Sequence, residues 1–227
     1  MAAPISRVNP LAKGLMRFLP LHWIAQPPGL AAELVAELPP GGLKGEIPLT
    51  WWAAGSYQGC LRRRLLQLRT SPKGAVVGEL VRELVEGLRA EFWSSPPLLV
   101  PIPSWKRRAN PLPALLGHSL SWQLGWRQAP LLERSRPVLG QHHLGRELRW
   151  TNQAGAFRCA TSNHASMQSR PPVVLIDDIL TTGATACAAA TALAAEGWQV
   201  AGMACLGRTP RQRRDLRSKS RFDDGPG

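Results

Sequence analysis

Apolar residues recur at helical spacing in three segments of the chain. The clearest runs from Val76 to Leu88, where apolar positions fall three or four residues apart and charged residues fill the other face. This period is typical of an amphipathic helix with one buried side. A second helix is expected from Ala114 to Trp126, and a short helical pattern runs from Leu30 to Leu38 within a segment rich in proline and glycine.

Continuous apolar runs predict strands between these helices. They span Leu98 to Pro103, Val173 to Ile176 and Gln199 to Leu206, and the last two flank an alanine-rich helix from Thr185 to Glu196 with Gly197 as its stop. Alternation of strand, helix and strand favours an α/β fold whose open sheet is mostly parallel.

Charge is spread unevenly over this framework of 227 residues, whose formal net charge is +13. Residues 98–159 carry a net +7, whereas residues 160–207 carry a net −2. We expect an N-terminal arm or small hood lobe over residues 1–50, one α/β domain over residues 51–209 and a basic tail over residues 210–227. The excess charge points to polyanionic partners and does not choose among them.

The four cysteines are far apart, so they form neither a zinc-ribbon pattern nor a disulfide framework. We expect reduced thiols in a cytoplasmic protein that binds no zinc. The N-terminal region lacks the pattern of a signal peptide, and no stretch is apolar enough to span a bilayer.

The segment from residue 173 to 185 carries the most chemistry. Its apolar run ends in two carboxylates, Asp177 and Asp178, and a turn with hydroxyl groups then opens a helix. Backbone N–H groups at a helix N-terminus bind phosphate, and glycine lets an anion approach the backbone closely. We call this segment the threonine turn; it consists of Thr181, Thr182, Gly183, Ala184 and Thr185.

The acidic pair follows a strand, where ligands of open α/β sheets bind. Asp177 and Asp178 can accept hydrogen bonds from ribose hydroxyls or hold Mg²⁺ through its waters. The plainer interpretation is a threonine N-cap beside two solvated carboxylates. The segment is neither a Walker A loop nor a GxGxxG dinucleotide turn.

This segment resembles the phosphoribosyl-pyrophosphate (PRPP) signature of type I phosphoribosyltransferases. The resemblance implies that Asp177 and Asp178 contact the ribose hydroxyls and that the threonine turn binds the 5′-phosphate. It also implies the phosphoribosyltransferase fold and Mg²⁺ bound together with PRPP or a related phosphorylated ribose.

A second resemblance covers residues 50–209. Val100-Pro101-Ile102-Pro103 and the later series Gln141, Leu144, Arg149, Asn152 and Gly155-Ala156-Phe157 are similar to the competence protein F (ComF) family. This resemblance implies a part in DNA uptake. Two features depart from the family: no zinc ribbon precedes Cys60, and Arg-Arg-Ala-Asn-Pro replaces the usual loop after the first strand.

Basic residues are candidates for binding the pyrophosphate part of a ligand such as PRPP. A pyrophosphate clamp is expected at Lys106, Arg107 and Arg108, just past a strand. The resemblance places a flexible catalytic loop at Arg134, Arg136, Gln141, Arg146, Arg149 and Asn152. A solvated basic surface is the alternative for both groups. Trp51 and Trp52 are candidates for stacking on nucleic-acid bases.

Three functions stay open on the sequence alone. The first is an enzyme that transfers phosphoribose from PRPP to a nitrogenous acceptor, a glycosyltransferase reaction. The second is a factor that handles single-stranded DNA, alone or with the DNA-uptake machinery, on the same scaffold. The third is a PRPP or nucleotide sensor without catalysis. Fold by itself does not separate them.

Overall fold

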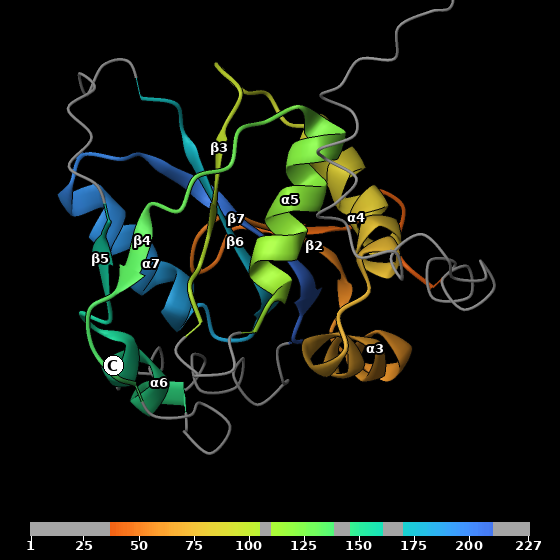
Figure 1. The fold of residues 1–227 in the computed structure, drawn as a ribbon, viewed down its shortest axis with the longest axis horizontal. Coiled ribbons are helices and arrows are strands. Elements are labelled where there is room, and N and C mark those ends of the chain that lie inside the picture. The colour runs from red at the N-terminus through yellow and green to blue at the C-terminus, as the bar shows by residue number, and fades with distance from the viewer. Residues whose placement is uncertain (1–36, 105–109, 139–145, 161–169, 211–227) are drawn as a thin grey trace, which may run out of the picture.

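The computed structural model describes residues 37–104, 110–138, 146–160 and 170–210 (Figure 1). The described chain is an α/β fold built around one five-stranded sheet. Its strands follow the order β1-β2-β7-β6-β3, and only β1 runs antiparallel to its neighbour. The strands are β1 (Leu43–Gly45), β2 (Trp51–Ser56), β3 (Leu98–Pro101), β6 (Val173–Leu180) and β7 (Val200–Arg208).

Helices cover both faces of this sheet, so alternate strand residues belong to two separate cores. One face packs against α3 (Gly59–Thr70), α4 (Gly74–Arg89) and α5 (Leu112–Leu124). The other packs against α7 (Ala184–Ala195) and a two-stranded sheet of β4 (Leu132–Arg134) and β5 (Phe157–Cys159). The short helix α6 (Arg146–Gln153) lies beside α7 (Figure 1).

The predicted helices are confirmed with small changes of boundary. In α4 the seven buried residues are the apolar positions of the predicted stripe. The second helix, α5, ends before Trp126 because Gly125 adopts a left-handed φ of 73° and stops it. Gly197 likewise follows α7 with a φ of 77°. The helical pattern from Leu30 to Leu38 lies, except for its last two residues, outside the described residues.

Strand β2 was not expected from the sequence, and it corrects the assignment of two tryptophans. Trp52 is buried, packs against Trp93 and donates from Nε1 to Glu91 Oε1 at 3.1 Å. Trp51 is half-buried in the same strand. Trp52 is therefore part of the core, and the Trp51–Trp52 pair is not an open platform for stacking bases.

Strand β1 precedes the domain start expected at residue 51, yet it pairs with β2 and extends the sheet. The residues after Thr209 fall almost entirely outside the described ranges, as does most of the arm over residues 1–50. In the described ranges, no helix combines the length and the apolar character that a membrane span needs.

Candidate ligand-binding cleft

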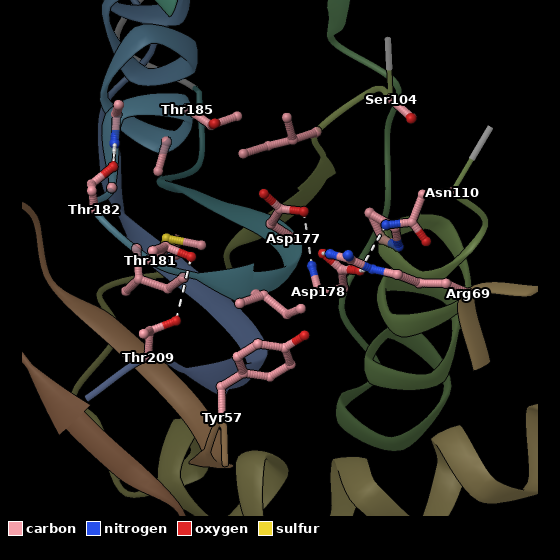
Figure 2. A pocket seen from close by; sticks show the side chains of 18 of the residues that line it. Tyr57, Arg69, Ser104, Asn110, Asp177, Asp178, Thr181, Thr182, Thr185 and Thr209 are labelled. Carbon is pink, nitrogen blue, oxygen red and sulfur yellow. Dashed lines mark hydrogen bonds and ion pairs between the residues drawn. The ribbon is translucent and has the colours of Figure 1, made fainter. Parts of the chain in front are cut away.

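Four parallel strands end at one edge of the sheet, and their ends surround an open cleft of about 970 Å³ (Figure 2). Tyr57 follows β2, Ser104 lies beyond β3, Thr181 follows β6 and Thr209 follows β7, and all four line the cleft. After β3 the chain forms α5 on one face, whereas after β6 it forms α7 on the other. Such a reversal between neighbouring strands is where open α/β sheets bind ligands.

Asp178, on β6, is enclosed by partners from two other segments. Arg69 on α3 donates from Nε to Asp178 Oδ2 at 2.6 Å and from Nη2 to Oδ1 at 3.0 Å. Asn110, just before α5, donates from Nδ2 to Asp178 Oδ2 at 2.7 Å. Burial alone lowers the pKa of Arg69, but hydrogen bonding and the charge of Asp178 outweigh it and raise that pKa. This ion pair ties α3 to the centre of the sheet.

Asp177 also lines the cleft, and the residues that the structure describes give it no comparable ion pair. Its Oδ1 accepts the backbone N–H of Asp178 at 2.8 Å, and its other oxygen points toward the side of the threonine turn (Figure 2). Burial and the neighbouring Asp178 charge raise the pKa of Asp177 to about 8, while Arg69 opposes the shift. A cation bound at this carboxylate would relieve the cost of its negative charge.

The threonine turn connects β6 to α7, and all five of its residues line the cleft. Thr182 Oγ1 accepts the Ala184 N–H at 3.4 Å, and Thr181 Oγ1 accepts the Thr209 hydroxyl at 3.3 Å. The N–H groups of the first helical turn have no intrahelical acceptor, which makes this end of α7 suited to an anion.

Gly183 is required in this turn for a reason that the sequence did not reveal. Its φ is +86°, and an added Cβ would lie 2.2 Å from Cγ of Pro48. The missing side chain therefore makes room for Pro48 as well as permitting a left-handed backbone.

A buried arginine supports the threonine turn from behind. Arg208 Nη1, at the end of β7, donates to the carbonyl oxygens of Leu180, Thr181 and Thr209 at 3.0, 2.5 and 2.9 Å. Its guanidinium also lies over the ring of Trp51. These contacts fix the backbone at the start of the turn and place a buried positive charge beside it.

Arg134, on β4, brings another guanidinium to the lining of the cleft. It donates to Pro103 O at 3.0 Å and to Gln153 Oε1 at 3.1 Å, and it stacks on Phe157 at 4.0 Å. Burial lowers the pKa of Arg134 to about 10, and the charge of Asp177 opposes this, so the group stays protonated at neutral pH. Gln153 is buried, and its Nε2 has no hydrogen-bond partner among the described residues.

The residues predicted for the flexible loop occupy different places. Arg134 and Arg149 line the cleft. Arg136 does not line it, because its guanidinium binds the backbone carbonyls of Asn152 and Ala154 and braces the end of α6. Arg146 is the first residue of α6. Gln141 and the predicted clamp lie outside the described residues; the clamp comprises Lys106, Arg107 and Arg108.

Several cleft residues were missed by sequence reasoning. Thr209 directly follows β7, a strand that the sequence predicts, and this position is a signal that could have identified it. Tyr57 follows β2, which the sequence does not predict. Arg69 lies four residues after the buried Leu65 on α3, so only its position beside the apolar stripe hinted at partial burial. Gln153 showed no signal of its own in the sequence.

Two curated proteins are similar to this chain. The DNA utilization protein YhgH of Escherichia coli (strain K12) is 27% identical over 164 residues, which cover 63% of this chain and 65% of that protein. The protein of the same name from Salmonella typhimurium is 27% identical over 158 residues, with 62% of each chain covered. No family model matches the chain. The matched region spans less than two thirds of the length of these relatives.

Proposed function

We propose that the cleft binds a 5-phosphorylated ribose such as PRPP together with Mg²⁺, in a protein of the ComF type with a phosphoribosyltransferase fold. The observation that carries this proposal is the joint position of Asp177 and the threonine turn. Asp177, whose pKa is raised by burial, lines the cleft four residues before Thr181, where the threonine turn that leads into α7 begins.

The parts of the cleft match the parts of such a ligand. The N–H groups at the start of α7 and the hydroxyls of the threonine turn would hold the 5-phosphate. Arg134 and Arg149, which also line the cleft, would supply positive charge for a pyrophosphate. Asp177 would hold Mg²⁺, which binds proteins through one or two carboxylates and keeps waters or substrate phosphates as its other ligands. When bound, Mg²⁺ would neutralise charge on the pyrophosphate.

A biological role in DNA utilization is supported by the names of the two similar proteins. The net charge of +7 over residues 98–159 fits a protein that meets DNA or nucleotides. We place this protein in the same process, with the cleft as the site that binds a nucleotide or its sugar phosphate.

Isothermal titration calorimetry with PRPP and Mg²⁺ tests the binding site. The Asp177→Asn variant should weaken Mg²⁺-dependent binding at least about tenfold, because a neutral amide holds the cation poorly. Glu79→Gln is the matched control, since Glu79 on α4 has a side chain that is 41% exposed and does not line the cleft. PRPP binding that is absent in the wild type, or unchanged in Asp177→Asn, would disprove this assignment.

Two further measurements separate the functional classes. In phosphoribosyl transfer the bond from sugar C1 to pyrophosphate breaks and a bond from C1 to an acceptor nitrogen forms, so pyrophosphate release with candidate acceptors distinguishes a transferase from a sensor. Direct DNA contact predicts binding of single-stranded DNA that weakens steeply with salt. No binding at low salt would exclude that contact.

A further inference from the structure

The two carboxylates near the end of β6, Asp177 and Asp178, differ in how many of their acceptor sites are free to bind a ligand. Asp178 is 3% exposed, and its oxygens accept three hydrogen bonds from Arg69 and Asn110. An ionised carboxylate has about four lone-pair sites, so the contacts of the described residues leave one on Asp178, which has little exposed surface. Both carboxylates line the cleft, but Asp177 has one oxygen turned away from these partners (Figure 2).

A phosphate on the threonine turn sets the direction of the sugar attached to it. In a furanose the chain of carbons runs from C5, which carries the phosphate, through C4 and C3 to C2. Figure 2 shows the threonine turn, Asp177, Asp178 and Arg69 in that order across the cleft. With its phosphate on the threonine turn, such a sugar would bring its 3-hydroxyl to Asp177. Its 2-hydroxyl would face Asp178, whose oxygens already accept hydrogen bonds from Arg69 and Asn110.

We infer that the sugar site recognises one hydroxyl group rather than two, and accepts 2-deoxyribose 5-phosphates, the sugar phosphates of DNA, as readily as ribose 5-phosphates. This inference rests on the proposed function, because it takes the threonine turn as the phosphate site. A site rejects a ligand that lacks a hydroxyl when the loss leaves a buried group unpaired. Here Asp178 keeps its three hydrogen bonds whether or not a 2-hydroxyl is present.

The test compares ribose 5-phosphate with 2-deoxyribose 5-phosphate by calorimetry on the full chain, with Mg²⁺ present. We expect the two dissociation constants to differ by less than about tenfold, since a lost hydrogen bond to a charged group alone accounts for about that factor or more. A preference for ribose of about tenfold or more overturns the inference and leaves the proposed phosphate site intact. If neither sugar phosphate binds to the folded protein, the proposed function fails and the inference fails with it.

Two variants make the assignment of the carboxylates testable. Asp177→Asn should weaken binding of both sugar phosphates by the same factor, because the 3-hydroxyl is common to them. Asp178→Asn should leave the ratio of the two affinities unchanged. A loss of affinity confined to ribose 5-phosphate in Asp178→Asn would show that Asp178 recognises the 2-hydroxyl.

A further variant covers the case in which Asp178→Asn does not fold. Asn110→Ala removes one donor to Asp178 Oδ2 and so frees an acceptor site for a 2-hydroxyl, and we expect it to shift the preference toward ribose 5-phosphate. An unchanged ratio in Asn110→Ala would contradict the role assigned to these donors.

Discussion

The guanidinium carbon of Arg208 lies 5.3 Å from the centre of the Trp51 ring, and the same guanidinium binds three backbone carbonyls around the threonine turn. Trp51 belongs to β2 and Arg208 to β7, so this contact joins two neighbouring strands behind the cleft. Arg208 thereby acts as a positioning residue for a turn that it does not itself belong to.

Replacing Arg208 should alter ligand binding without touching the ligand. In Arg208→Met three carbonyl oxygens lose their donor, so we expect a loss of about 2–4 kcal/mol in the free energy of unfolding and weaker phosphate binding. Arg208→Lys keeps the charge but not the planar donor group, so it should retain only part of the stability and part of the affinity for phosphate. Urea denaturation and calorimetry with PRPP measure the two effects. Phosphate affinity equal to wild type in folded Arg208→Met would contradict the positioning role.

The pair of Arg69 and Asp178 should be strongly coupled. The Arg69→Met variant removes the cation that pairs with Asp178, whose side chain is almost fully buried. The unpaired buried charge should lower the free energy of unfolding by about 3 kcal/mol. The double variant Arg69→Met with Asp178→Asn should lose less than the sum of the single changes. A double-mutant cycle by urea denaturation measures the coupling. Additive effects would mean that the ion pair contributes nothing to folding.

Gly183→Ala should disturb the threonine turn sharply. The positive φ and the short approach to Pro48 both oppose a Cβ at this position. We expect a loss of at least about 1 kcal/mol and weaker phosphate binding. Gly78→Ala on α4 is the control, because a Cβ there meets nothing within 4 Å and alanine favours the helix by about 1 kcal/mol. The melting temperature should fall in Gly183→Ala and rise in Gly78→Ala, as thermal unfolding would measure. A change in the same direction in both variants would contradict this account.

The stability of the ligand-free protein should fall as pH rises between about 4 and about 8 because of Asp177. Over that window the folded state keeps a proton on Asp177 that the unfolded state has lost, so raising the pH favours unfolding by up to about 1.4 kcal/mol per pH unit. Asp177→Asn should flatten this part of the profile, whereas Glu79→Gln should not. Urea denaturation across the window provides the measurement, and an unchanged slope in Asp177→Asn would show that the pKa of Asp177 is not raised.

Elements with a clear period could be predicted from the sequence, and elements without one could not. The stripe of α4 has the helical period and is buried as expected. Strand β2 reads Trp-Trp-Ala-Ala-Gly-Ser, which shows no alternation because most of the strand is buried on both faces. Strand β6 continues four residues beyond its apolar run, because the backbone pairing with β7 includes Asp177, which pairs with Cys205.

The residues of the site also fall into a group that the sequence predicts and a group that it does not. The acidic pair and the threonine turn are contiguous, so their residue types and order suggest a phosphate site from the sequence alone. Arg69 and Gln153 reach the cleft from distant segments, and no local pattern distinguishes them from other polar residues on helices. The partnership of Asp178 with Arg69 depends on the tertiary fold, which also explains why the two carboxylates look equivalent in the sequence.

The contact of Pro48 with Gly183 has a consequence for how the cleft forms during folding. The two residues are separated by most of the folded chain, so the turn reaches its final shape only after the segment before β2 has docked on the sheet. Contacts of such long sequence separation form late, because their loop-closure entropy must be overcome first. A nascent chain or a fragment that begins at residue 51 would lack the proline that covers this glycine, and ligand binding would therefore report on completion of the fold.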